Sequence, residues 1–594
     1  MSARDRVAQA LRRIAMVLGF ASATSLLLQA GFSMGSPRAF DLLDISLAVG
    51  FVVVWLVELS QAKLPAEAVR RRNVELAVLL GFLVSLTVLL LLPDAVQDQL
   101  ETSLRHRAGE LGFFLLRVFL FLCVSLQLLR AAERVLSAGI RAEYLLAGSF
   151  LVIIVTGSLL LLLPAASARA EAPIGLVDAI FTSTSAVCVT GLAVRDTGKD
   201  FSVSGQTVIA ALIQIGGLGI VTFVALLSSL SNKALPVPQM VAFRHLINAP
   251  EIGDLRRRVI GIVVITLVVE GLGAMMLFRC ADPAMPGIDR LGWAMFHSVS
   301  AFCNAGFGLY TNNLEFAVRD PGINITVMLL IIAGGLGFLV IPEVLAAFWV
   351  GGKELLPGRF FRAGKPGFRW PKFSVQTRLS LWVTGILIVV GTLGIWLVES
   401  ERLFSGFGTF DAVMASAFQS VTARTAGFNT VPIGGLQNAT LILIMFLMVI
   451  GGSPVSTAGG IKTVTFAILI LGLKALVTGK DRLEVFGRTL PTRAIFSALN
   501  VFVLYAISAT AGLLAVSLFD PAVPLRDAGF EVISALSTVG LSTGITAGLS
   551  PGSKIALCLL MFIGRIGPIA LVLSVFQARA RIAYDFPEED VVVG

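Results

Sequence analysis

Apolar segments long enough to span a lipid bilayer recur along the whole chain and are separated by short polar connections. Runs such as 145–164 and 259–278 have the roughly 20 residues that an α-helix needs to cross the hydrocarbon core. Other segments, rich in serine, threonine and alanine, are too short to cross. The pattern predicts an all-α polytopic membrane protein that also contains re-entrant segments.

From residue 141 onward the segments fall into four units, each with a spanning helix, a short re-entrant helix and a second spanning helix. The repeats occupy about 141–235, 250–352, 373–480 and 490–580 of a core at 141–594, which ends in a short cytoplasmic tail. The expected segments are 143–164, 176–192 and 206–229; 258–279, 290–308 and 323–349; 376–399, 411–429 and 438–475; and 494–518, 526–543 and 553–577. Irregular backbone at membrane depth is tolerated only where protein or a water-filled cavity surrounds it. We therefore expect four repeats around a central pore.

The N-terminal region, residues 1–140, is expected to form about four extra transmembrane helices, at 14–32, 42–60, 74–93 and 111–130. A basic start followed by an apolar run also fits a cleaved signal peptide, but three more apolar segments follow closely, which favours an uncleaved helix. A voltage sensor needs arginines at every third residue. The stretch between Arg117 and Arg130 is uncharged, so a packing or assembly role is favoured.

Each re-entrant segment ends in a short motif with glycine at its third position. The motifs are Val189-Thr190-Gly191, Asn304-Ala305-Gly306, Thr425-Ala426-Gly427 and Thr538-Val539-Gly540. Successive glycines are separated by 115, 121 and 113 residues (306 − 191, 427 − 306 and 540 − 427), and so regular a period indicates a repeated structural unit. Thr-Val-Gly begins the sequence whose backbone carbonyls replace the hydration shell of an ion in potassium channels. The twelve residues are therefore predicted to form a selectivity filter, with K⁺ bound at the four glycines.

A second glycine cluster follows each motif by about 25 to 30 residues, at 216–219, 334–337, 451–454 and 564–567. Glycines that only pack helices together are the alternative explanation. In the third repeat, Pro454 and four glycines interrupt an apolar stretch, 438–475, that is too long for one straight crossing. We expect a broken helix there, with an intramembrane loop below the filter, rather than a mere kink. The candidate gate residues of the loop are Gly451, Gly452, Ser453, Pro454, Gly459, Gly460 and Lys462.

Arg565 is the last candidate gate residue, because a charge at membrane depth is costly and usually functional. It follows Gly540 by 25 residues, and Gly452 follows Gly427 by the same 25. The equal offsets predict similar depth in one pore. Structural pairing of Arg565 with Glu270 or Glu343 is the alternative.

Acidic residues lie at the starts of three re-entrant helices, at Asp178, Asp411 and Asp527. Helix N-capping is the favoured explanation for them, and attraction of cations to an external mouth is the alternative. Neither explanation changes the predicted architecture.

Lysine and arginine concentrate in alternate loops, at 1–13, 63–72, 130–141, 233–258, 353–378 and 474–493. The positive-inside rule then makes both termini cytoplasmic, in a plasma (inner) membrane, with all four filter segments on the outer side. The Arg105-His106-Arg107 loop departs mildly from this pattern.

Composition and charge exclude several function classes. The chain is 56% hydrophobic and 14% charged, and its net charge of +9 is spread between apolar segments rather than on one basic face, which excludes nucleic acid as a partner. The five cysteines have no C-x-x-C spacing and the three histidines are scattered, so neither a disulfide framework nor a zinc site is predicted. No catalytic carboxylate pair or Ser-His-Asp set is evident, so an enzyme is not expected.

From about residue 143 to 594 the chain resembles the superfamily of potassium transporters that comprises TrkH, KtrB and plant HKT proteins, and it looks most like the bacterial members. The filter glycines of that family fall on Gly191, Gly306, Gly427 and Gly540. Some sodium-selective plant relatives have serine at the first of these positions, so the resemblance favours potassium. It also makes 451–463 a gating loop and Arg565 a positive residue of the pore wall. The terminus, 584–594, looks like that of KtrB, whereas the N-terminal helices have no counterpart there.

The resemblance implies a potassium-translocating subunit of a Ktr/Trk-type uptake system, with channel-like permeation. K⁺ would be the transported ion, no cofactor is bound, and Na⁺ stays open as a coupling or activating ion. The implied partners are a second copy of the chain in a homodimer, cytoplasmic nucleotide-binding (RCK/KTN-type) regulatory subunits, and membrane lipid. The alternative is an ion-coupled secondary transporter of Na⁺ or a small solute, although fourfold rather than twofold repetition disfavours two rocking halves.

Overall fold

The computed structural model describes residues 37–60, 142–169, 173–219, 254–354, 373–479 and 483–567, with isolated positions at 14–25 and 116–120. The described part is almost entirely helical. Four of its helices contain segments long and apolar enough to cross a membrane, namely Val259–Cys280, Pro321–Ala347, Val375–Glu399 and Arg493–Phe519. The predicted polytopic helical class is confirmed.

Four repeats make up the chain from residue 142 to 567, each with a first helix, a pore helix and a second helix. The first helices are α7 (Ala142–Leu161), α12 (Asp254–Cys280), α15 (Val375–Glu399) and α19 (Arg493–Phe519). The pore helices are α8 (Leu176–Val187), α13 (Gly287–Phe302), α16 (Thr409–Thr422) and α20 (Leu525–Leu536). The second helices are α9 (Val203–Leu218), α14 (Pro321–Glu354), the pair α17 (Asn438–Val449) and α18 (Thr463–Val477), and α21 (Pro551–Ile566). Short 3-10 turns at Pro164–Ala166, Glu315–Ala317, Ile433–Gly435 and Thr546–Gly548 lie in the connections.

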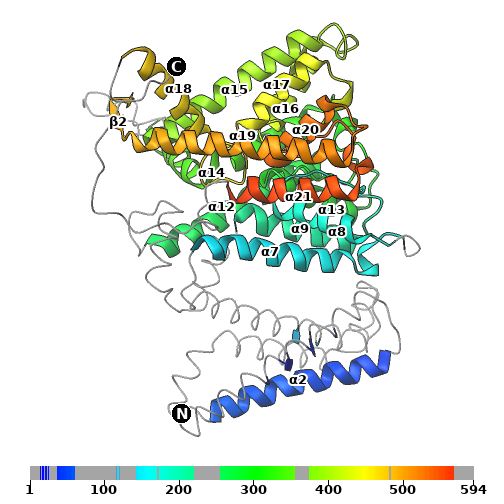
Figure 1. The fold of residues 1–594 in the computed structure, drawn as a ribbon. Coiled ribbons are helices and arrows are strands. Elements are labelled where there is room, and N and C mark those ends of the chain that lie inside the picture. Colours follow the sequence, from blue (N-terminus) through cyan, green and yellow to red (C-terminus); the bar gives the residue numbers. More distant parts are fainter. Residues whose placement is uncertain are drawn as a thin grey trace.

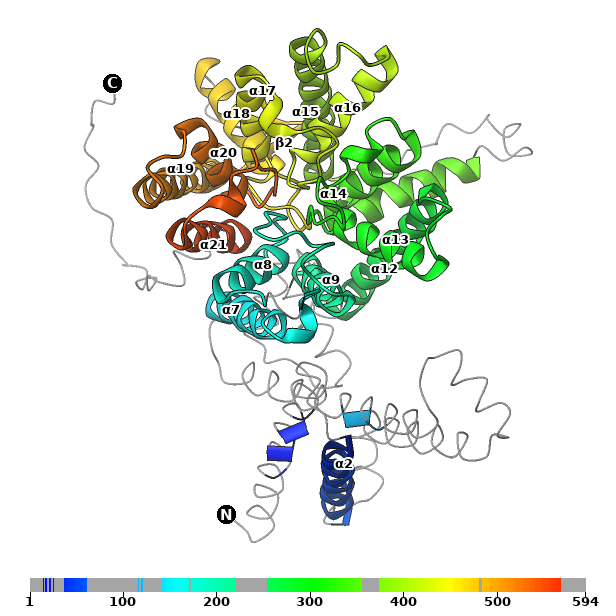
Figure 2. The same ribbon diagram turned by 90° about the vertical axis from the view of Figure 1, so that its right-hand side faces the viewer.

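The repeats follow one another around a common centre, and the ring closes between the last and the first (Figure 2). Helix α9 contacts α13, α14 contacts α16, α17 contacts α20, and α21 returns to α8. An ion pair strengthens this closure, because Lys554 Nζ on α21 lies 3.1 Å from Asp178 Oδ1 on α8. Figure 1 shows the repeats side by side, with α2 (Pro37–Ser60) lying apart from them.

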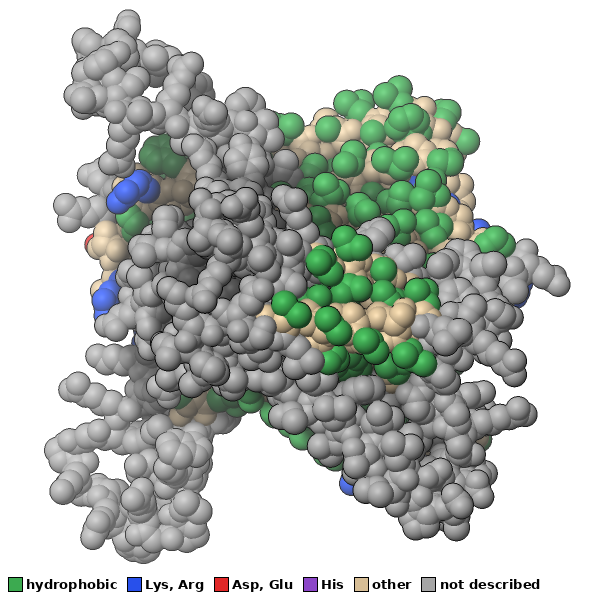
Figure 3. Space-filling view, turned by 90° about the horizontal axis from the view of Figure 1, so that it is seen from below, with side chains coloured by type: hydrophobic (Ala, Val, Ile, Leu, Met, Phe, Trp, Pro, Cys, Tyr) green, Lys and Arg blue, Asp and Glu red, His purple; other side chains and the backbone are tan. Residues whose placement is uncertain are grey.

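Apolar side chains face outward on the first helices and polar ones lie inside. On α19, Leu514 and Leu518 are exposed, as expected of side chains that face lipid. Hydrophobic side chains cover much of the coloured surface in Figure 3. By contrast, the serines and threonines of pore helix α8 are buried. Ser183 Oγ is bonded to the Ile154 carbonyl of α7 at 2.8 Å, which satisfies a polar group that would otherwise be costly to bury.

The second helices approach the pore helices so closely that only glycine fits at the contact. A β-carbon placed on Gly564 would contact the carbonyl oxygen of Leu536, the last residue of α20, and lie 2.8 Å from its carbonyl carbon. Gly216 stands in the same relation to Val187, and Gly334 to Phe302. Three of the four second glycine clusters therefore do pack helices, in addition to any other role.

Three second helices that we expected to be continuous are interrupted at equivalent glycines. Helix α9 ends before Gly219 (φ 77°), α14 contains Gly337 (φ 82°), and α21 ends before Gly567 (φ 91°). The prediction of unbroken helices at 206–229, 323–349 and 553–577 is therefore wrong at these glycines, because positive φ does not continue an α-helix. Residues 220–229 and 568–577 of the expected segments lie outside the described residues.

A small β-hairpin between the third and fourth repeats was not predicted. Strands β1 (Leu483–Val485) and β2 (Arg488–Leu490) pair antiparallel. Phe486 and Gly487 form the two-residue turn with φ of 49° and 73°, the left-handed geometry that suits a tight hairpin.

In the N-terminal region the structure describes one expected helix. Helix α2 begins five residues before the predicted start at 42 and ends as predicted at 60. Its Phe51 packs with Phe119 and Leu120 in an apolar cluster separate from those of the repeats. The helices predicted at 14–32, 74–93 and 111–130 lie outside the described residues apart from isolated positions, so the division at residue 140 stays a prediction.

Prediction for the glycine contacts: Gly564→Ala should destabilise the purified protein by about 1–3 kcal/mol, because the new methyl group has no room against the Leu536 carbonyl. The measurement is the Tm in detergent. Gly271→Ala on α12 is the matched control, since a β-carbon there meets nothing within 4 Å, and its Tm should stay level or rise slightly. Equal melting of the two variants would contradict the packing role.

Candidate functional site

The four motif glycines form a closed ring at the centre of the repeats. A β-carbon on Gly191 would lie 2.9 Å from the Cα of Gly306, and one on Gly306 would lie 2.9 Å from the Cα of Gly427. The corresponding values are 3.1 Å from Gly427 to Gly540 and 3.0 Å from Gly540 back to Gly191. Each β-carbon would also collide with a carbonyl oxygen of the neighbouring repeat, from Ala305, Ala426, Val539 and Thr190 in turn. The ring therefore excludes every side chain.

The sign of φ alternates along each of the four motifs, with positive values at the first and third residues. The glycines have φ of 93°, 69°, 80° and 95°, and the residues two positions earlier, Val189, Asn304, Thr425 and Thr538, have φ of 57°, 61°, 70° and 51°. The residue between them is not left-handed in any motif. This alternation departs from a regular strand, in which φ is negative at every residue. Left-handed backbone at non-glycine residues costs about 1–3 kcal/mol each and persists where the surroundings enforce it, commonly at functional sites.

Hydroxyl groups of the pore helices hold the motifs from behind. Ser185 Oγ accepts the Gly191 N–H at 3.1 Å, and Ser534 Oγ accepts the Gly540 N–H at 3.1 Å. In the other two repeats the hydroxyl donates to the carbonyl of the residue after the glycine, from Ser300 to Phe307 (2.8 Å) and from Thr422 to Phe428 (2.7 Å). These four hydroxyls follow a buried phenylalanine by four residues, at Phe181, Phe296, Phe418 and Phe530.

The pore helices direct their C-terminal ends toward the ring, because each chain passes from helix to motif within a few residues. Four partially negative helix ends favour a cation there. At the opposite ends, N-capping by aspartate is wrong for the described helices, since the N-cap positions are Gly175, Gly408 and Pro524 without side-chain cap bonds. The aspartates lie in the first turn instead, and Asp178 is paired with Arg195 as well as Lys554.

The intramembrane loop that we predicted at 451–463 occupies residues 450–462, which join α17 to α18 next to the ring. Its ends pair with each other, since Gly451 N donates to Ile461 O (2.9 Å) and Thr463 N donates to Gly452 O (3.0 Å). A β-carbon on Gly459 would lie 2.7 Å from the Ser537 carbonyl oxygen, at the base of the fourth motif. The broken helix expected in the third repeat is therefore present.

The loop also contacts the second repeat. Ser453 N donates to Gly335 O at 2.8 Å, and Thr457 Oγ1 donates to Phe302 O at 3.2 Å. Within the loop, Lys462 Nζ donates to Ala458 O at 2.5 Å. The loop thus touches residues of three repeats.

Arg565 binds the loop from the fourth repeat. Its guanidinium donates to the carbonyls of Thr457 in the loop and Gly216 in the first repeat. The two carboxylates considered as alternative partners bond elsewhere: Glu270 accepts from Cys303 Sγ (3.7 Å) and Glu343 accepts from Ser374 N (3.0 Å). The structure thus brings Arg565 and the candidate gate loop together, and their role as a gate stays a prediction.

Arg424 belongs to the same region and was given no role from the sequence. It is buried, and its Nη2 donates to Gly451 O at 2.9 Å. Arg424 immediately precedes its motif, and the residues at the same position before the other three motifs are Cys188, Cys303 and Ser537. This single charge among small residues was the signal available in the sequence.

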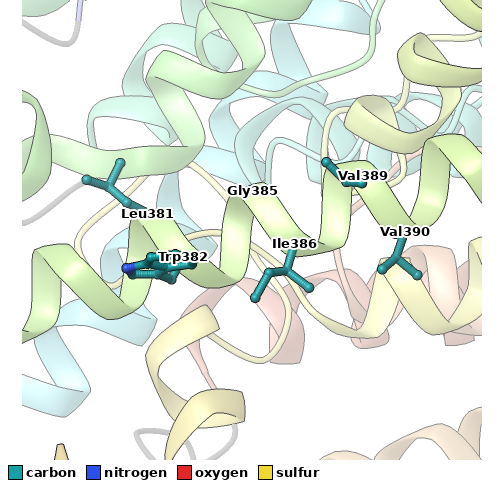
Figure 4. A pocket seen from close by; sticks show the side chains of 6 residues that line it. All are labelled: Leu381, Trp382, Gly385, Ile386, Val389 and Val390. Atoms are coloured by element: carbon teal, nitrogen blue, oxygen red, sulfur yellow. The ribbon is translucent and has the colours of Figure 1, made fainter. Parts of the chain in front are cut away.

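A hollow of about 550 Å³ lies elsewhere, along the outward face of α15 (Figure 4). Its lining is apolar, from Leu381, Trp382, Gly385, Ile386, Val389 and Val390. Such a surface offers no ligand to an ion, so the ring of motifs is the candidate site.

Comparison with known proteins agrees with this geometry. The family model of TrkH, described as a cation transport protein, matches residues 113–580. The chain is 35% identical to the Ktr system potassium uptake protein B of Bacillus subtilis over 458 residues, which covers 76% of this chain and 96% of that protein. It is 34% identical to the potassium/sodium uptake protein NtpJ of Enterococcus hirae over 457 residues, with the same coverage.

A solved structure shares the fold. The potassium transporter TrkH from Vibrio parahaemolyticus superposes with a TM-score of 0.58 at 20% identity, covering 85% of this chain and 98% of that one. The family expected from the filter motifs is confirmed, and the chain belongs to the TrkH family of cation transport proteins.

Proposed function

We propose that this chain is the potassium-translocating membrane subunit of a Ktr/Trk-type uptake system, with channel-like permeation through the ring of four filter motifs. The observation that carries the proposal is the closed ring of Gly191, Gly306, Gly427 and Gly540, which leaves only backbone around the central axis. Carbonyl oxygens in that setting can replace the water around an ion. The relatives are named as uptake proteins, so a transporter is favoured over an enzyme.

Potassium is the favoured ion, and sodium stays open as a second one. Glycine at all four positions keeps every part of the ring free of side chains. NtpJ is named for both potassium and sodium uptake, so a coupling or activating role for Na⁺ is compatible with the family. A ring closed by direct contacts among four repeats favours a fixed filter over two halves that rock about a midplane site.

The gate in this proposal consists of loop 450–462 and Arg565. The loop lies against the filter base, and the guanidinium is bonded to it at Thr457. A fixed positive charge beside the ion path repels K⁺ by about 4 kcal/mol at 4 Å for an effective dielectric constant of 20. Displacing the loop and the arginine together would therefore open the path.

The chain is proposed to work as a homodimer in the plasma (inner) membrane, with both termini cytoplasmic. Cytoplasmic nucleotide-binding subunits of the RCK/KTN type would regulate it, as the resemblance to Ktr systems implies. Residues 1–140 are proposed to be an accessory region. The TrkH family model leaves out residues 1–112 but includes 113–140, and α2 packs with residues 116–120 in an apolar cluster separate from those of the repeats.

Prediction for the filter: Gly191→Ser should lower the preference for potassium over sodium, because its side chain would displace the Ala305 carbonyl of the neighbouring repeat. Competitive uptake of the two ions measures this. Gly175→Ser is the matched control in the same repeat, since a β-carbon there meets nothing within 4 Å. An unchanged ion ratio in Gly191→Ser would exclude the filter assignment.

Prediction for the gate: Arg565→Ala, or deletion of the loop, should raise potassium flux several-fold and weaken its dependence on the regulatory subunit. The physical reason is that Arg565→Ala removes the electrostatic barrier to K⁺, and deletion of the loop removes the segment that blocks the ion path. Flux into proteoliposomes with and without the subunit is the readout. Arg526→Ala, which removes a half-exposed arginine at the far end of α20, serves as control. Unchanged flux and regulation in both gate variants would place the gate elsewhere.

Prediction for the N-terminal region: a chain that starts near Arg134 should still take up potassium, because the repeats close their ring without α2. Uptake in cells that lack their own potassium systems is the assay, scaled by the amount of protein in the membrane. A truncated chain that is present at the normal level yet inactive would make residues 1–133 part of the transport machinery.

A further inference from the structure

A buried polar residue stands directly after the buried phenylalanine in every pore helix. We call these four the backing residues; they are Thr182, His297, Gln419 and Glu531. The side chains of His297, Gln419 and Glu531 are fully buried, and Thr182 is 3% exposed. Helical spacing places them one turn before the hydroxyls that hold the filter glycines. They therefore lie on the buried side of the pore helices, next to the filter motifs.

Two of the backing residues bond to the chain three residues beyond the filter glycine. The Nε2 of His297 accepts the Leu309 N–H at 3.3 Å, and the Gln419 amide donates to Thr430 Oγ1 at 3.3 Å. The His297 tautomer is fixed from both sides, because Nδ1 lies 2.8 Å from the Trp293 carbonyl and must carry the proton. The same position in two repeats thus supports the strand that leaves the filter.

Glu531 supports the fourth strand through three donors. Its Oε1 accepts from Ser542 Oγ (2.5 Å) and Thr543 N (3.2 Å), and its Oε2 accepts from Thr546 Oγ1 (2.8 Å). Ser542 Oγ in turn accepts the Gly544 N–H at 2.9 Å. One carboxylate therefore fixes residues 542 to 546, two to six positions past Gly540.

The chemistry of this contact suits an ionised carboxylate. A carboxylate only accepts hydrogen bonds, and each of the three groups that face Glu531 can donate one: the Thr543 N–H can only donate, and the Ser542 and Thr546 hydroxyls can donate as well as accept. Burial of a charge is costly unless its hydrogen bonds are satisfied, and in the described structure these bonds come from hydroxyls and a backbone N–H. A glutamine keeps the shape but loses the negative charge, and its NH₂ group must donate to Thr546 Oγ1 where a carboxylate oxygen accepted.

We propose that Glu531 is a positioning residue for ion selectivity: it fixes the outer strand of the fourth filter and thereby the place of the Val539 carbonyl in the ring. The inference rests on the proposed function and deepens it. Val539 O faces Gly427 of the neighbouring repeat, and Gly540 faces Thr190 O, so movement of this strand disturbs the ring at two of its four contacts. Support is weakest in the first repeat, where the Thr182 hydroxyl has no hydrogen-bond partner in the described part of the chain.

The test compares Glu531→Gln with Thr546→Val, which removes one donor from the opposite side at nearly constant shape. Purified protein in proteoliposomes gives the ratio of potassium to sodium flux and the total flux. We expect the ratio to fall several-fold in Glu531→Gln and by less, in the same direction, in Thr546→Val. Both proteins should insert at the normal level, and if Glu531→Gln does not, Thr546→Val and Ser542→Ala give the answer.

Glu399→Gln is the matched control. Glu399 is equally buried and accepts from Gln437 N (2.8 Å) and Thr440 Oγ1 (2.6 Å), but it joins α15 to α17 instead of supporting a filter. Its loss should reduce protein yield and leave the ion ratio unchanged. A fall of the ratio in Glu399→Gln equal to that in Glu531→Gln would overturn the inference, because general destabilisation would then explain both.

The outcomes separate this inference from the proposed function. A wild-type protein that does not discriminate potassium from sodium overturns both. A wild-type protein that discriminates, together with unchanged ratios in Glu531→Gln and Thr546→Val, overturns only the role of Glu531. A lower ratio in those two variants, with the Glu399→Gln ratio intact, supports it.

Discussion

The repeats approach one another backbone to backbone at the ring of four motif glycines. A β-carbon at any of these positions would collide with a carbonyl of the next repeat, so the distance between repeats is set by the main chain alone. In a packed interior a change in side-chain volume of even one methylene affects stability. At the ring no side chain is present that could change its conformation to relieve such a change. The pore helices, their hydroxyls and the tight glycine contacts of the second helices all serve to hold four strained strands at this separation.

The third repeat departs from the other three in several related ways. Its pore helix reaches the filter one residue sooner, since Phe418 precedes Gly427 by nine residues where the other repeats have ten. Its second helix is divided by loop 450–462. In the other repeats a second-helix glycine packs on the last carbonyl of the pore helix, whereas here Arg424 reaches across to Gly451 O. The buried guanidinium thus fills a position that is a backbone contact elsewhere.

Repeated motifs made much of this architecture predictable. The glycines at 191, 306, 427 and 540 have a regular spacing, and Pro454 with its neighbouring glycines cannot continue a helix, so both the repeated motifs and the broken helix follow from local chemistry. The breaks at Gly219, Gly337 and Gly567 were missed because glycines clustered in an apolar stretch are compatible with a continuous helix that packs closely on its neighbour.

Contacts between repeats were beyond prediction for a different reason. The partners of Arg565 are backbone carbonyls at 216 and 457, and a backbone carbonyl has no signature in the sequence. Carboxylates such as Glu270 and Glu343 are visible in the sequence, and they drew the alternative interpretation. Likewise, the donors that face Glu531 come from ordinary serines and threonines, whose role depends on where the strand beyond the filter turns.

Closure of the ring between its first and last members has a consequence for biosynthesis. Gly540 contacts Thr190, 350 residues earlier (540 − 190), and Lys554 pairs with Asp178 across 376 residues. Chains are made from the N-terminus, so the first three motifs are synthesised before the fourth. Until the fourth repeat is inserted, the first motif lacks the contact that Gly540 makes with Thr190. Contacts of such long sequence separation form late and slowly. A chain that ends before the last repeat therefore has an open arc of three motifs, with an uncovered face at Thr190 and Gly191, rather than a smaller closed ring.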